Sequence, residues 1–152
     1  MLDALRRLIA SLTGAPAQRF ASDDYRLATA ALFLHVISLD GDPAEVELRR
    51  LQSGLEAFFN IDANTAWALV EAAAAIEGDD IGLDRFVNPI RRALPHAGRL
   101  RVVEMIWDLV YADERMTEFE DSLVWRAAEL LGVSAAESEM LRQRVLSRRQ
   151  SP

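Results

Sequence analysis

Residues 28–59 read ATAALFLHVISLDGDPAEVELRRLQSGLEAFF, and residues 101–132 read RVVEMIWDLVYADERMTEFEDSLVWRAAELLG. When the two segments are aligned without a gap, they share four residues, and all four are acidic. The shared pairs are Asp40 and Asp113, Glu45 and Glu118, Glu47 and Glu120, and Glu56 and Glu129. Apolar residues also correspond in kind, at the spacing of helix faces. The pattern predicts a duplicated unit in which an acidic turn joins two helices.

Size and composition limit which classes of protein and which kinds of site the chain can form. The chain has 152 residues, 51% of them hydrophobic, which suits one domain with a well-buried core. Its net charge of −7 argues against nucleic acid as a main partner, because phosphate binding usually needs a basic surface. The absence of cysteine excludes disulfides, thiolate metal sites and cysteine nucleophiles. With only two histidines, a histidine-rich zinc site is not expected.

Apolar periodicity and turn residues predict an all-α fold of seven to eight helices. We expect an amphipathic helix and linker over residues 1–21, a helical domain over residues 22–149, and a short tail over residues 150–152. Ser134 is expected to cap the last helix, and Gly132 to end the helix before it. The expected helices span residues 2–12, 23–39, 43–59, 63–75, 83–94, 100–112, 117–131 and 134–148.

The chain ends are basic, whereas the middle is acidic. Residues 1–20 carry three arginines and one aspartate, and residues 140–152 carry four arginines and no acid. The amphipathic segment Leu2–Leu12 and the segment Gln143–Arg149 could therefore dock on anionic lipid at the inner membrane face. The alternative is that they pack on the body of the protein or on a second copy in a homodimer.

No apolar run approaches the roughly 20 residues of a membrane span, and no signal peptide is evident, so we expect a cytoplasmic protein.

Helical spacing indicates where the repeated carboxylates point. Asp40 continues the apolar row of Phe33 and Ile37, and Asp113 occupies the matching place in the second unit. Glu47 and Glu120 precede apolar rows on the following helices, whereas Glu45 and Glu118 should face elsewhere. An aspartate at a helix C-terminus opposes the helix dipole by about 0.3–1 kcal/mol. Such groups need a cation or several hydrogen-bond donors, and Ca²⁺ or Mg²⁺ suits oxygen ligands better than Zn²⁺ does.

Capping and ion pairing explain the same acids without a metal. Asp42, Pro43 and Glu45 have the order of an N-cap, a proline at N1 and a capping-box acid at N3. Thr117–Glu120 offers a second capping box, and neighbouring arginines could supply ion pairs. An EF-hand is not supported, because Ala44 and Leu51 stand where that loop needs ligands. Both interpretations, metal ligands and structural caps, remain open at this point.

The doubled pattern resembles the TerB-like family of tellurite-resistance proteins, in its short stand-alone form. The resemblance is carried by residues 36–47, VISLDGDPAEVE, by WDLVYAD at 107–113, and by the acids at 118 and 120. It implies an all-helical fold with pseudo-twofold repeats, an acidic site suspected of binding metal, and association with bacterial stress responses, including tellurite resistance. The metal-site candidates carried over by the resemblance are Asp40, Asp42, Glu47, Asp113 and Glu120. The second turn reads Asp113-Glu114 where the family usually has Asp-Gly, which departs from that pattern.

Catalysis is not predicted. The chain lacks a nucleophile elbow and a phosphate-binding glycine loop. His35 is expected to be a packed helix residue, and His96 to lie solvated in a Pro/Gly loop. The tryptophans and the phenylalanines at 33, 58 and 59 are expected in the core. A helical module that binds a divalent cation or an unknown protein partner is the leading interpretation, and a membrane or protein scaffold is the alternative.

Overall fold

The computed structural model describes residues 20–21, 24–38, 41–76, 82–112 and 118–150, without the side chains of 118–121 and 150. Its described part is helical, without strands, which confirms the all-α prediction. The predicted helix over residues 2–12 lies outside the described residues. None of the described helices is long and apolar enough to cross a bilayer. The helices are α2 (Tyr25–Ile37), α3 (Glu45–Phe59), α4 (Ala63–Ala74), α5 (Asp84–Ala93), α6 (His96–Ala112), α7 (Glu118–Leu130) and α8 (Ala135–Gln150).

Helix α2 is the centre of the molecule. It packs against α3, α4, α5, α6 and α7. Most of its 13 residues are buried, and Leu32 and Phe33 are fully so. A helix that is apolar on all sides is stable only when neighbours cover it on all sides. Asp24 caps its N-terminus by accepting a hydrogen bond from the Arg26 backbone N–H at 2.9 Å, so the helix begins after Asp24 rather than after Ser22 as predicted.

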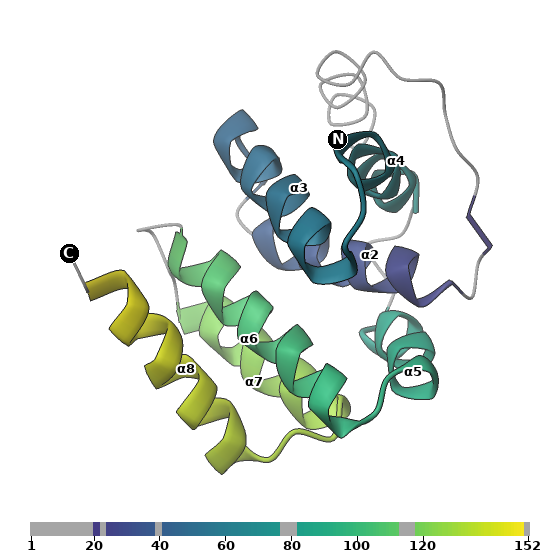
Figure 1. Ribbon diagram of the computed structural model, residues 1–152. Helices are drawn as coiled ribbons and strands as arrows, with labels where there is room; N and C mark the ends of the chain where they lie inside the picture. Colours follow the sequence, from purple (N-terminus) through teal and green to yellow (C-terminus); the bar gives the residue numbers. More distant parts are fainter. Residues whose placement is uncertain (1–19, 22–23, 39–40, 77–81, 113–117, 151–152) are drawn as a thin grey trace.

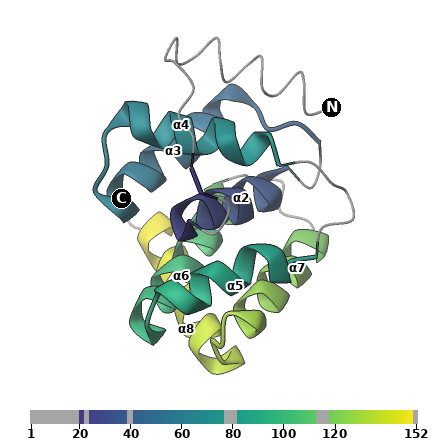
Figure 2. The same cartoon turned by 90° about the vertical axis from the view of Figure 1, so that its right-hand side faces the viewer.

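Two groups of three helices follow the same contact pattern. In the first, α2 packs on α3 and α4, and in the second, α6 packs on α7 and α8. Figure 1 shows α2–α4 in the upper part of the molecule and α6–α8 in the lower part. Figure 2 shows the layers from the side, with α3 and α4 above α2 and with α5 to α8 below it. The groups meet where α2 and α3 contact α6 and where α2 contacts α7.

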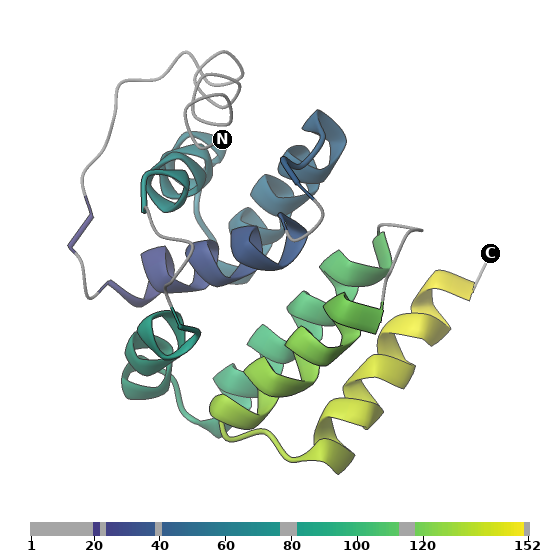
Figure 3. The same ribbon diagram turned by 180° about the vertical axis from the view of Figure 1, so that it is seen from behind.

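The second group holds the largest fully buried side chain among the described residues. Trp107 on α6 is fully buried, and its indole N–H donates to the Ser138 hydroxyl on α8 at 3.1 Å. Trp125 meets it edge-on with the ring centroids 5.4 Å apart. Figure 3 shows α6, α7 and α8 side by side from behind. Phe33, Trp67 and Trp107 are buried, and Phe58, Phe59 and Trp125 pack partly buried against the core, as predicted.

Local signals at the helix ends were confirmed in the second group. Gly132 has a φ of +77°, and the Val133 N–H donates to the Ala128 carbonyl at 2.9 Å, which is a glycine-ended helix C-terminus. At the start of α8 the Glu137 N–H donates to the Ser134 hydroxyl at 3.1 Å, while the Ser134 N–H donates to the Glu137 carboxylate at 3.0 Å. These reciprocal bonds form a capping box.

Candidate functional site

The first acidic turn begins where α2 ends. The Gly41 N–H donates to the Ser38 carbonyl at 3.1 Å, and Gly41 has a φ of +122°. This backbone conformation favours glycine, which has no Cβ to clash. Pro43 is buried, whereas Asp42 is exposed. Gly41 and Pro43 thus turn the chain from α2 into α3 and leave Asp42 facing solvent.

Glu47 caps helix α3. Its carboxylate accepts a hydrogen bond from the Ala44 backbone N–H at 3.1 Å, and Ala44 is the N-cap. The predicted capping box with Asp42 at the N-cap and Glu45 at N3 is therefore wrong by two residues. The reason is that Ala44 keeps an extended backbone, with a ψ of 161°, so the first helical residue is Glu45. Of the two acids at this helix start, Glu47 is the one that reaches back to the cap.

Glu45 points away from Glu47, as its spacing predicted. Its side chain is 53% exposed and forms an ion pair with Arg49, one helical turn along, at 2.9 Å. Such an exposed pair contributes little to stability, about 0.3–0.5 kcal/mol. Although Glu45 recurs in the second half of the sequence, it lies away from the inner face of the turn.

The ends of both repeated helices meet at one small cavity, which we call the turn cavity. Ile37 at the end of α2 and Ala112 at the end of α6 both line it. In the sequence Asp113 follows Ala112 directly, and Asp40 follows Ile37 by three positions. The cavity has a volume of about 40 Å³ and is lined by Ile37, Val46, Glu47, Arg50, Leu109 and Ala112.

The predicted metal ligands are described only in part. Asp42 and Glu47 have described side chains, and only Glu47 lines the turn cavity. Asp40 and Asp113 lie outside the described residues, and Glu120 lies in α7 with its side chain outside the description. Among the described side chains, no three acids or histidines gather into a metal-binding group. The five-residue ligand set therefore stays a prediction.

The turn cavity has enough oxygen ligands for a hard cation only if acids whose side chains the structure does not describe also contribute. Glu47 uses one carboxylate oxygen for its cap, and a carboxylate has about four acceptor sites in all. The Ser38 hydroxyl oxygen, at the end of α2, is buried with no hydrogen-bond partner among the described residues, but it does not line the cavity. The oxygens of Glu47 alone are too few for the 6–8 ligands of Ca²⁺. A complete site would need Asp40, Asp113 or Glu120.

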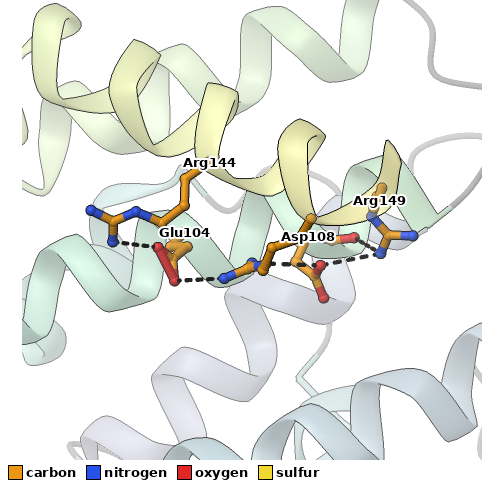
Figure 4. Close-up of polar contacts among 5 residues, drawn as sticks. Glu104, Asp108, Arg144 and Arg149 are labelled. Carbon is orange, nitrogen blue, oxygen red and sulfur yellow. Dashed lines mark hydrogen bonds and ion pairs between the residues drawn. The ribbon is translucent and has the colours of Figure 1, made fainter. Parts of the chain in front are cut away.

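A second and larger cavity was not predicted from the sequence. It lies among α3, α6 and α8, has a volume of about 410 Å³, and we call it the arginine cleft. Beside it, three arginines of α8 face two acids of α6, as Figure 4 shows. Arg144 and Arg148 bind the Glu104 carboxylate at 3.0 and 3.4 Å, and Arg149 binds Asp108 at 3.2 Å. The arginines of residues 140–152 were the one sequence signal for this cluster. Their acidic partners lie about 40 residues earlier in the chain, so the pairing could not be read from the sequence.

The C-terminal arginines thus pack on the body, the alternative that the sequence left open. Val145 on the inner face of α8 is fully buried. The N-terminal segment Leu2–Leu12, the other half of the membrane hypothesis, lies outside the described residues.

Neither histidine belongs to a metal-binding group in the described part of the chain. His35 packs against Phe86, and its burial lowers the pKa of the imidazole. The prediction that His96 lies in a loop is wrong, whereas its side chain is exposed to solvent as predicted. His96 begins α6 and lies 2.7 Å from the Glu137 carboxylate of α8. The hydrogen bonds from His96 and Ser134 lower the pKa of Glu137 to about 2.

Comparison with known proteins supports the resemblance noted from the sequence. No curated protein matches the chain significantly, and no solved structure does so either. The family model described as tellurite resistance protein TerB matches residues 26–143, which is most of the chain and includes both acidic turns. The matched region extends from the start of α2 into α8. The chain therefore belongs to the TerB family.

Proposed function

We propose that this protein is a non-enzymatic helical module whose two acidic turns together bind a divalent cation, Ca²⁺ or Mg²⁺ rather than Zn²⁺. Membership of the TerB family supports a role in a bacterial stress or tellurite response, in the cytoplasm. The ligands would come from Asp40, Asp42, Glu47, Asp113 and Glu120. One observation carries the proposal: the helix ends that precede the two turns line the same cavity as Glu47.

The mechanism follows from like-charge repulsion. Carboxylates gathered at one cavity repel one another when no cation is present, and a bound cation relieves that repulsion. The turn cavity lies between the two three-helix groups, since α2 and α3 belong to one and α6 to the other. Binding would therefore stabilise the fold and could change the angle at which the groups meet.

The alternative function is a scaffold for a protein or a membrane, in which the acids are only caps and ion pairs. Its support is that all three described repeat acids of α3 already have partners. Glu45 pairs with Arg49, Glu47 accepts from the Ala44 amide, and Glu56 accepts from the Gln52 side chain. Val46, which lines the turn cavity, is 63% exposed and offers an apolar contact for a partner or for a second copy in a homodimer. Peripheral membrane contact through the chain ends belongs to this alternative.

Thermal unfolding of chelator-treated protein, titrated separately with Ca²⁺, Mg²⁺, Mn²⁺ and Zn²⁺, tests the proposal. A ligand at one hundred times its Kd stabilises the fold by about 2.7 kcal/mol, which raises the Tm by several degrees. We expect a saturable rise with Ca²⁺ or Mg²⁺ that is lost in Asp40→Asn and Asp113→Asn. No rise with any ion would reject the metal site and favour the scaffold.

Glu47 variants separate capping from ion binding. Glutamine can replace glutamate at N3 of a capping box, whereas alanine cannot. We therefore expect Glu47→Gln to keep the stability of the ion-free protein but to weaken the response to the ion. Glu47→Ala should lose stability as well, by about 0.5–2 kcal/mol. Glu45→Gln is the matched control and should leave the ion response unchanged, because Glu45 faces solvent.

A further inference from the structure

The arginine cleft is basic in a protein whose net charge is −7. Three arginines, on three helices, line it: Arg50 on α3, Arg101 on α6 and Arg148 on α8. Two acids of α6, Glu104 and Asp108, also line it.

The two acids of the cleft are already neutralised from the α8 side. Glu104 pairs with Arg144 and Arg148, and Asp108 pairs with Arg149 at 3.2 Å and with Arg148 at 3.9 Å (Figure 4). Three guanidinium groups thus share two carboxylates. These acids do not offset the charge of the remaining arginines of the cleft.

Arg50 and Arg101 form no ion pair with any carboxylate in the described part of the chain. Both are exposed. The Arg101 guanidinium lies over the Phe58 ring, 4.8 Å from its centroid, which holds the side chain against the wall of the cleft. Within the part of the chain that the structure describes, the cleft therefore presents two positive charges without a counter-ion.

We propose that the arginine cleft binds a phosphate monoester that carries a small apolar group. A phosphate monoester has a charge of about −1.5 to −2 at pH 7, which matches two guanidinium groups, and the planar guanidinium fork suits phosphate oxygens. Gly54, Ala57 and Met105 supply an apolar wall for the organic group. The volume of about 410 Å³ is within the range of small-molecule sites.

Calorimetric titration of the full chain with phenyl phosphate tests this proposal, with benzyl alcohol as the neutral comparison. Saturable binding of phenyl phosphate alone is expected. Arg101→Gln should weaken it about ten-fold or more, the factor that corresponds to about 1.4 kcal/mol. Arg91→Gln is the matched control, because Arg91 is an exposed arginine of α5 that does not line the cleft. Absence of binding, or equal weakening by Arg91→Gln and Arg101→Gln, would overturn the proposal.

Two further arms define the ligand. Co-sedimentation with vesicles that contain phosphatidic acid, compared with vesicles of pure phosphatidylcholine, distinguishes a lipid headgroup from a soluble phosphate. If the protein pellets with phosphatidic acid and Arg101→Gln reduces the pelleting, the ligand is a lipid headgroup. If the protein binds phenyl phosphate but does not pellet, the ligand is a soluble monoester. Phthalate that binds as tightly as phenyl phosphate would contradict the choice of phosphate. Because Arg50 also lines the turn cavity, Arg101→Gln is the cleaner variant, and it should leave the response to divalent ions unchanged.

Discussion

Gly132 shows how a single residue can hold a helix end. Its φ of +77° is a conformation that costs a residue with a Cβ about 1–2 kcal/mol. A Cβ there would also lie 2.9 Å from Nη1 of Arg99, the atom that donates to the Leu131 carbonyl at 3.0 Å. The glycine thus permits both the turn and the arginine contact that completes the end of α7.

Gly132→Ala is therefore expected to lower the free energy of unfolding by about 1–2 kcal/mol, measured by urea denaturation. Gly82→Ala is the control, because a Cβ added at Gly82 would meet no atom within 4 Å and Gly82 is not among the glycines with a positive φ. That change should stay within about 0.5 kcal/mol. Equal losses in both variants would contradict the role assigned to Gly132.

His35 should make stability depend on pH near neutrality. Burial lowers its pKa in the folded protein below the ordinary value of 6.5, so below that value the unfolded chain binds more protons than the folded chain. Stability is then fully present above about pH 6.5 and falls as the pH drops towards the folded-state pKa. His35→Gln should flatten the denaturation free energy between pH 7 and pH 5. An unchanged slope in this variant would show that other groups cause the dependence.

At the scale of elements, burial outweighs charge in holding α8 on α6. Val145 is fully buried, whereas the arginines that pair with Glu104 are about half exposed. Removing two buried methyl groups costs about 1.5–2.5 kcal/mol with the cavity included. An exposed ion pair contributes about 0–1 kcal/mol.

We therefore expect Val145→Ala to destabilise the protein more than Glu104→Gln does, as measured by chemical denaturation. The effect of Glu104→Gln should shrink further in 1 M salt, because salt screens exposed charges. If Glu104→Gln cost more than Val145→Ala, the ion pairs rather than the packing would dominate the docking of α8.

At the scale of the whole molecule, the two three-helix groups share one core. Helix α2 packs on α4 in its own group and on α6 and α7 in the other. A helix buried by both groups cannot keep its apolar surface covered if either group unfolds alone. The shared helix therefore couples the two groups, and the turn cavity lies at their junction.

One cooperative unfolding transition is the expected result. Trp107 and Trp125 lie in the second group and Trp67 lies in the first, so Trp67→Phe restricts tryptophan fluorescence to the second group. In this variant, the thermal midpoint of the fluorescence change should coincide with the midpoint of the helical circular dichroism signal, which reports both groups. Two separated midpoints would show that the groups unfold independently.

Much of the helical architecture followed from the sequence by itself, because its signals are local. Helix α4 was predicted over residues 63–75 and spans Ala63–Ala74, and Ser134 and Gly132 occupy the cap positions that their residue types favour. Hydrophobic periodicity and cap chemistry act within a few residues, so they can be read without knowing the fold.

Only the tertiary structure decided which distant residues meet. It moved the start of α3 to Glu45, paired His96 with Glu137, and brought the ends of α2 and α6 to one cavity. It also placed Arg50 and Arg101 in a common cleft, where neither pairs with a carboxylate of the described residues. Helical spacing tells which face a residue occupies, but the packing of one helix on another, which depends on the whole core, decides what that face meets.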